Sequence, residues 1–193
     1  TRKFVDDLRA SMSASLGMVE DSDWNGVLCL GMGGSGAGGL FLKALSDDSG
    51  GLPFVVWTDY GVPSWWGPEW LVMATSYSGN TEETLDGVRE VLSAGGTVVG
   101  ICSGGELEDI LSESEDSVCL NVPPGQMPRS AFGHIFGTQL SACWELGILP
   151  RPSPKFIISI FKITTLYFIC SSSTIGYTFV LAFLSRSYSC SIH

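Results

Sequence analysis

A glycine-rich run, GMGGSGAGG, occupies residues 31–39, directly after a short apolar stretch and before a segment with helical character. Glycine adopts left-handed backbone angles without steric cost and lets the backbone come close to a ligand. Free amides at the start of the following helix attract anions, and Ser35 adds a hydroxyl donor. The run therefore predicts an anion-binding turn. A tight turn that only packs a helix on a strand is the alternative.

The same glycines leave a second kind of site open. Gly31, Gly33 and Gly36 also match the G-x-G-x-x-G spacing of dinucleotide-binding folds. Asp59 follows the next apolar run, where such folds place the acid that binds the ribose. This alternative would make the chain a nucleotide-binding oxidoreductase.

A second motif, SYSGNTEET, spans residues 76–84, between an apolar run and a predicted helix. Ser76, Ser78 and Thr81 place three hydroxyls there. Asn80 or Thr81 could cap the helix, but capping explains one hydroxyl rather than three. Several donors converging on one point suit a phosphate group, which accepts many hydrogen bonds. The motif therefore predicts a phosphate-binding loop.

A third motif, PPGQMPRSAFGH, spans residues 123–134. Its prolines hold the backbone extended and rigid, and so would fix Arg129 as a cation beside the sheet. Arg129 is the only basic residue between Arg89 and Arg151. His134, on the helix that follows, is predicted to be a structural or surface histidine rather than a catalytic one.

These motifs are positioned by alternating strand and helix signals. Strands are predicted at 27–30, 54–57, 71–75, 97–101 and 118–120, and helices at 4–16, 40–45, 81–94, 107–111 and 132–146. The strands are continuous apolar runs, which indicates burial on both faces. The pattern predicts an α/β fold with a doubly wound, flavodoxin-like, five-stranded parallel sheet. Its first and third strands are neighbours at the switch point, so the first two motifs should share one crevice. A dinucleotide site would not need the second loop.

Charge divides the chain in two. Residues 1–150 hold all 20 acidic residues and six basic ones, a net charge of −14, whereas residues 151–193 hold four basic residues and no acid. We therefore predict one domain at 1–150. The overall charge of −10 argues against nonspecific nucleic-acid binding, which needs a basic surface.

The segment 151–193 is rich in Ser, Ile and Phe. Its apolar runs at 156–163 and 177–184 are shorter than the ~20 residues of a membrane span. Lys162 would also be costly inside a bilayer. We therefore interpret this tail as atypical sequence, frameshifted, chimeric or disordered, rather than as a membrane anchor.

Six cysteines, at positions 29, 102, 119, 143, 170 and 190, form no CxxC pair and no zinc-type spacing with histidine. They are interpreted as small buried hydrophobic residues in a reducing compartment. The polar start of the chain shows no signal peptide. A cytoplasmic location without a bound metal is therefore expected.

Together the three motifs resemble the sugar isomerase (SIS) domain. GMGGSGAGG, SYSGNTEET and PPGQMPRSAFGH look like the bifunctional phosphoglucose/phosphomannose isomerase family, and the match covers residues 1–150, the first of that family's two SIS domains. The resemblance implies an isomerase that interconverts glucose 6-phosphate or mannose 6-phosphate with fructose 6-phosphate through an enediolate. It implies no cofactor and a homodimer in the full-length family.

The resemblance also implies roles for individual residues. Ser76, Ser78 and Thr81 would bind the sugar phosphate, with Gly34 and Ser35 near the substrate. Arg129 would stabilise the negative enediolate.

In that family, the general base, a Glu, and the His and Lys that open the sugar ring come from the second half of the protein. This chain departs from the family's pattern after about residue 150. Glu82 and Glu83 lie on the helix of the phosphate loop and are poor candidates for the base. We therefore expect binding of the sugar phosphate with little turnover. A non-catalytic SIS module that binds sugar phosphates remains the main alternative.

Overall fold

The computed structural model describes residues 2–12, 23–127 and 130–150. Three of the sequence predictions lie outside these residues: the end of the first helix at Leu16, the position of Arg129, and the nature of the tail 151–193.

Five strands alternate with helices along the described chain. In order, the elements are α1 (Arg2–Ser11), β1 (Gly26–Leu30), α2 (Gly33–Ser49), β2 (Phe54–Trp57), β3 (Trp70–Thr75), α3 (Glu82–Ser93), β4 (Val98–Cys102), α4 (Glu106–Ser112), β5 (Val118–Asn121) and α5 (Phe132–Glu145). The predicted strands are confirmed to within a residue or two.

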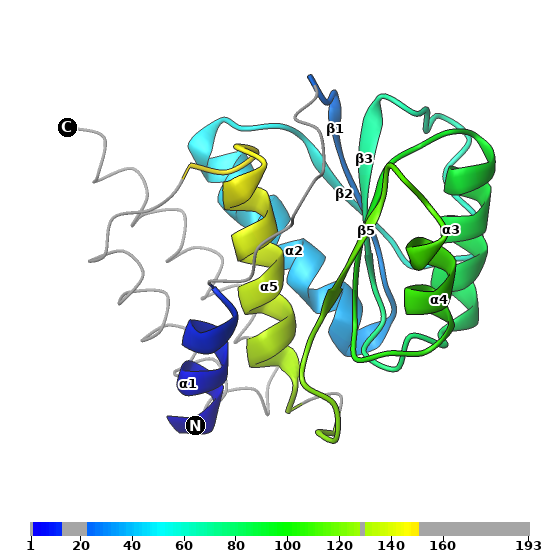
Figure 1. The fold of residues 1–193 in the computed structure, drawn as a ribbon. Coiled ribbons are helices and arrows are strands. Elements are labelled where there is room, and N and C mark those ends of the chain that lie inside the picture. Colours follow the sequence, from blue (N-terminus) through cyan, green and yellow to red (C-terminus); the bar gives the residue numbers. More distant parts are fainter. Residues whose placement is uncertain (1, 13–22, 128–129, 151–193) are drawn as a thin grey trace.

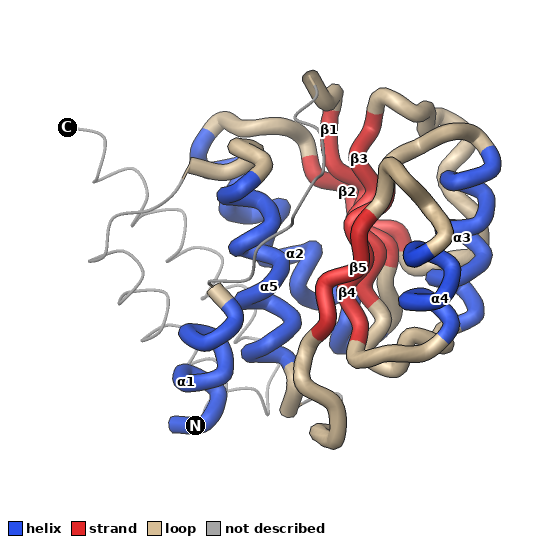
Figure 2. Tube along the Cα trace, in the orientation of Figure 1, coloured by secondary structure: helices blue, strands red, loops and turns tan. Residues whose placement is uncertain are grey.

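The strands form one sheet in the order β2-β1-β3-β4-β5, and every pair is parallel. Figure 2 shows the strands as a central layer between two layers of helices. The predicted five-stranded α/β sheet is therefore confirmed. Because β1 lies between β2 and β3, the chain reverses its direction of winding at β1.

Helices cover both faces of the sheet (Figure 1). One face packs against α2 and α5, and α1 packs on α5, around a core that contains Phe41, Phe132 and Phe136. The other face packs against α3 and α4 around a smaller core that contains Val88 and Leu107. Burial on both faces explains why the strands read as unbroken apolar runs.

Helix α2 begins inside the glycine run, at Gly33, earlier than the prediction of a helix from Leu40. Glycine is a poor helix former, so local propensity does not place the start there. Packing explains the glycines at the start of α2, because a β-carbon on Gly39 would lie 2.8 Å from Cys29 Cβ, and a β-carbon on Gly38 would clash with Gln139. Most of the glycines therefore allow the helix to pack closely.

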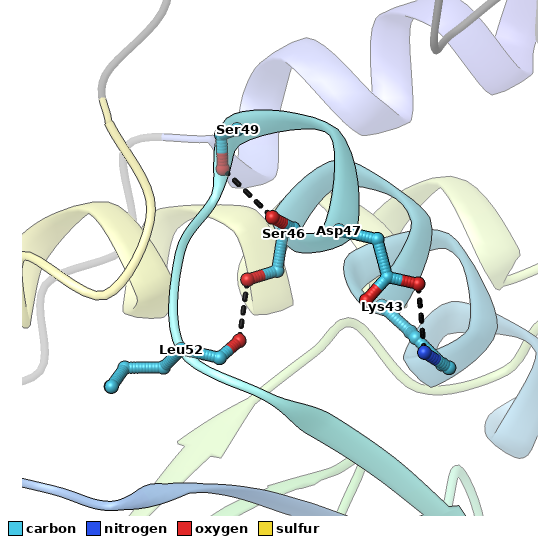
Figure 3. A network of polar contacts seen from close by, with 5 residues as sticks. All are labelled: Lys43, Ser46, Asp47, Ser49 and Leu52. Carbon is cyan, nitrogen blue, oxygen red and sulfur yellow. Dashed lines mark hydrogen bonds and ion pairs between the residues drawn. The ribbon is translucent and has the colours of Figure 1, made fainter.

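The other end of α2 is held against the start of β2. The buried Ser46 hydroxyl donates to the Leu52 carbonyl oxygen, and Ser49 donates to the Ser46 carbonyl oxygen at 3.2 Å (Figure 3). Lys43 and Asp47 pair on the exposed side of the same turns, with 2.7 Å between Nζ and Oδ2. The Ser46 contact ties the C-terminal end of α2 to the chain that leads into β2.

The cysteines of the described chain are free thiols. Cys29, Cys102 and Cys143 are buried, as predicted, but Cys119 is partly exposed. Burial raises the pKa of Cys29 to about 12, so this thiol stays protonated and behaves as an apolar side chain. Among the described residues, none of the helices combines the length and apolar character needed to span a bilayer.

Candidate functional site

The two predicted ligand loops start side by side at the carboxyl edge of the sheet. Leu30, the last residue of β1, pairs with Ala74 in β3. The chains then stay close, because a β-carbon on Gly31 would lie 2.9 Å from the Thr75 carbonyl oxygen. The glycine run therefore begins beside the end of β3, directly before the hydroxyl motif.

The glycine loop leads into the N-terminus of α2 without a side-chain cap. Met32 is the N-cap residue and makes no capping hydrogen bond through its side chain. Gly33 has the positive φ, +53°, that only glycine adopts easily. Gly34 is exposed, and a β-carbon there would meet no atom within 4 Å. The first turn of a 17-residue helix therefore opens onto free space, where its amides favour an anion.

The hydroxyl loop holds its three side chains in different environments. Ser76 has no exposed surface, and its Oγ lies 2.8 Å from Thr81 Oγ1. Thr81 is partly buried, whereas Ser78 is exposed. Ser78 Oγ accepts a hydrogen bond from the Asn80 backbone N–H at 3.2 Å. Ser78 and Thr81 are therefore the two hydroxyl-bearing residues of this loop with accessible surface, and Ser76 is hydrogen-bonded to Thr81.

Side-chain capping does not account for this loop. Thr81 is the N-cap residue of α3, but its side chain makes no capping hydrogen bond. Asn80 does cap a helix, but a different one, because its Oδ1 accepts from the Glu106 N–H of α4 at 3.1 Å. The N-terminus of α3, like that of α2, is left without a side-chain acceptor at its cap.

Tyr77 connects the hydroxyl loop to the third motif, a role that the sequence did not reveal. Its hydroxyl donates to the Pro123 carbonyl oxygen at 3.1 Å and accepts from the Gln126 N–H at 2.9 Å. Its own carbonyl oxygen accepts hydrogen bonds from the Ser103 N–H and hydroxyl. The chain that leads to Arg129 is thus attached to the hydroxyl loop up to residue 126, while Arg129 itself lies outside the described residues.

His134 lies between α5 and α1, as predicted for a structural histidine. Its Nε2 is 3.2 Å from Asp7 Oδ1, and its Nδ1 is hydrogen-bonded to the Ser11 hydroxyl at 2.7 Å. Both nitrogens are therefore engaged by α1, and the residue is buried. These contacts stabilise the packing of α1 on α5.

Carboxylates near the loops also have partners. Asp59 Oδ1 accepts from the backbone N–H of Tyr60 at 2.8 Å, and Glu82 Oε2 accepts from the Tyr60 hydroxyl at 3.1 Å. The Glu82 hydrogen bond, and then the charges of Glu82, Glu83 and Asp86, raise the pKa of Tyr60. Within the described ranges, no group of three or more His, Cys, Asp or Glu side chains is arranged to hold a metal ion.

A hollow of about 290 Å³ lies elsewhere, between the C-terminal ends of α3 and α4. Leu92, Ile110 and Asp116 contribute to its lining. In a parallel α/β sheet this is the edge opposite to the one where ligands bind. We therefore assign the candidate site to the two loops rather than to this hollow.

Comparison with known proteins gives an independent result. The family model of the SIS domain matches residues 22–149. The bifunctional phosphoglucose/phosphomannose isomerase of Caldicellulosiruptor bescii is 34% identical over 131 residues, which are 68% of this chain and 38% of that protein. The D-glucosamine-6-phosphate 4-epimerase of Sulfolobus acidocaldarius is 38% identical over 109 residues, which are 55% of this chain and 33% of that protein. The chain thus spans less than two fifths of the length of these relatives.

A solved structure shows the same fold. Tagatose-6-phosphate ketose/aldose isomerase from Escherichia coli superposes with a TM-score of 0.53 at 16% sequence identity. The superposition covers 85% of this chain and 50% of that one.

Proposed function

Because the chain belongs to the SIS domain family, we propose that it forms the phosphate-binding domain of an aldose–ketose isomerase that acts on hexose 6-phosphates. The observation that supports this most directly is the pair of uncapped helix N-termini, of α2 and α3, which follow neighbouring strands and are accompanied by the Ser78 and Thr81 hydroxyls. Helix amides together with hydroxyls supply the donors that a phosphate dianion needs, even in a chain with a net negative charge.

Each residue of the proposed site contributes a different group to phosphate binding. Gly34 offers its backbone amide and Ser35 its hydroxyl from α2, while Ser78 and Thr81 offer hydroxyls from the second loop; the Ser35 amide already donates to the Met32 carbonyl oxygen at 3.0 Å. Ser76 acts through its hydrogen bond to Thr81. These groups hold the phosphate and so place the sugar carbons at a constant distance from it.

In this proposal, isomerisation moves a proton between C1 and C2 through an enediolate. Arg129 stabilises the negative oxygen of that intermediate, which is the kind of electrostatic stabilisation that dominates many enzymatic rate enhancements. Glu82 accepts a hydrogen bond from the Tyr60 hydroxyl and belongs to the helix whose N-terminus is proposed to bind the phosphate. The general base therefore comes from other parts of the complete enzyme, as in the family that the motifs resemble.

The proposed setting follows from the same reasoning. Free cysteines in the described chain suit the reducing cytoplasm. The family resemblance favours a homodimer with a sugar phosphate as its small-molecule partner, without a cofactor, and the acidic charge disfavours nucleic acid.

The ligand class is tested by thermal unfolding in the presence of candidate ligands. We expect glucose 6-phosphate and fructose 6-phosphate to raise the melting temperature, because a ligand that binds only the folded state stabilises it. Neither unphosphorylated glucose nor NAD should change the melting temperature. Stabilisation by NAD without any response to glucose 6-phosphate would overturn the proposal and favour the dinucleotide site near Asp59.

The hydroxyl loop is tested by removing single hydroxyls. We expect Ser78→Ala and Thr81→Ala each to weaken glucose 6-phosphate binding by about 1.5–3 kcal/mol, the usual cost of losing a hydrogen bond to a charged group. This corresponds to roughly a ten- to hundredfold higher dissociation constant in titration calorimetry.

Ser93→Ala is the matched control for these variants. Ser93 is exposed on α3, and its hydroxyl is bonded to the Arg89 carbonyl oxygen near the far end of the helix. This variant should bind as the unmodified chain does. An unchanged affinity in both loop variants would show that the phosphate lies elsewhere.

A further inference from the structure

The loop after β2 crosses the carboxyl edge of the sheet next to the candidate site. Near its start, the Thr58 Cγ2 atom would lie 3.7 Å from a β-carbon on Gly36, in the first turns of α2. Three residues later, the Gly61 carbonyl oxygen would lie 2.8 Å from a β-carbon on Gly87 of α3. The segment 58–61 thus passes from one face of the sheet to the other, between the helices whose N-termini form the proposed phosphate site.

Three carboxylates on one stripe of α3 hold this crossing segment in place. They stand one helical turn apart and accept hydrogen bonds from three consecutive residues. Glu82 accepts from the Tyr60 hydroxyl at 3.1 Å, Asp86 from the Gly61 N–H at 2.9 Å, and Glu90 from the Val62 N–H at 3.1 Å. Such a ladder removes much of the conformational freedom that a surface loop would otherwise have.

Tyr60 is the large exposed side chain of the crossing segment, with 53% of its surface accessible. Its hydroxyl is anchored on Glu82, the first residue of α3, directly after Thr81. Its ring is therefore held beside the phosphate-binding loop. A fixed and exposed aromatic ring offers a flat apolar surface at little entropic cost, which suits the C–H face of a sugar.

We propose that Tyr60 forms the wall of the site that contacts the sugar part of a phosphosugar, while the two loops hold its phosphate. This inference rests on the proposed function and adds to it a residue that recognises the carbon skeleton rather than the anion. The carboxylate ladder of Glu82, Asp86 and Glu90 positions this wall.

The test compares two ligands that share a phosphate. Titration calorimetry is carried out with glucose 6-phosphate and with inorganic phosphate. We expect Tyr60→Ala to weaken glucose 6-phosphate binding by about three- to tenfold, the range of one aromatic contact. Its affinity for inorganic phosphate should stay within about twofold of that of the unmodified chain. Tyr60→Phe keeps the ring and should retain at least about half of the sugar-phosphate affinity.

Trp65→Ala is the matched control, because Trp65 is an equally exposed aromatic residue of the same β2–β3 connection, and its ring packs on Trp70 instead of a site residue. It should change neither affinity. The inference is overturned if Tyr60→Ala binds glucose 6-phosphate normally while Ser78→Ala does not, and this result leaves the proposed function standing. It is also overturned if Tyr60→Ala weakens both ligands equally. If the unmodified chain binds neither ligand, the proposed function fails and the inference fails with it.

Discussion

Replacing Gly79 by alanine is expected to lower the free energy of unfolding by about 3 kcal/mol or more, the largest stability effect of a single methyl group in the candidate site. Gly79 has a φ of +70°, which costs an L-residue roughly 1–2 kcal/mol. The added β-carbon would also overlap the Gly104 carbonyl oxygen. Backbone cannot turn aside as a flexible side chain does, so the hydroxyl loop and the β4–α4 loop must separate.

The Gly95→Ala variant separates the cost of the positive φ from the cost of the clash with Gly104. Gly95 has a similar φ, +75°, but a β-carbon there meets nothing within 4 Å. Urea unfolding should therefore show a loss of about 1–2 kcal/mol for Gly95→Ala, from backbone strain alone. Equal losses in the two variants would mean that the contact between the loops at Gly79 and Gly104 contributes nothing.

Replacing Gly34 by alanine is expected to weaken glucose 6-phosphate binding by about tenfold or more, a loss of at least about 1.4 kcal/mol. The new methyl group would clash with no protein atom, because no atom lies within 4 Å of its position. It would instead enter the open space in front of the first turn of α2, where the phosphate is proposed to lie. Stability should not fall, because alanine favours a helix over glycine by roughly 0.5–1 kcal/mol.

Gly36→Ala, two residues further along α2, provides the contrast. Its β-carbon would lie 2.5 Å from the Gly31 carbonyl oxygen, so this variant should lose stability as well as binding. Calorimetry and urea unfolding on both variants distinguish an effect on the ligand from an effect on the fold. If Gly34→Ala binds glucose 6-phosphate normally, the phosphate does not lie at the N-terminus of α2.

The sequence predicted the sheet well because its signals are local. A strand buried on both faces requires an unbroken apolar run, and the run at Val27–Leu30 could hardly be anything else. The two loops were visible for a similar reason, since their glycines and hydroxyls stand together in short runs directly after a strand. The alternation of strands and helices then placed β1 next to β3, and so brought the loops together.

The contacts within the site could not be predicted, because each depends on a partner far along the chain or on competition between neighbours. Asn80 and Thr81 both match a capping pattern for α3, yet Asn80 caps α4 and Thr81 bonds Ser76. Tyr77 lies inside a recognised motif, but its hydroxyl function depends on residues 46 and 49 positions away. In the sequence, only the prolines of the third motif indicated that its loop is held in a fixed position.

The amino-acid sequence by itself determined the fold class and the adjacency of β1 and β3, because the burial pattern of each strand lies in a short stretch of chain. It also supplied the motifs on which the proposed phosphate site rests. The tertiary structure alone decided which hydroxyl-bearing residues of the second motif are accessible and how Tyr60 is held beside them. The physical reason is that hydrogen bonds such as Tyr60–Glu82 join residues whose proximity arises only when the helices pack on the sheet.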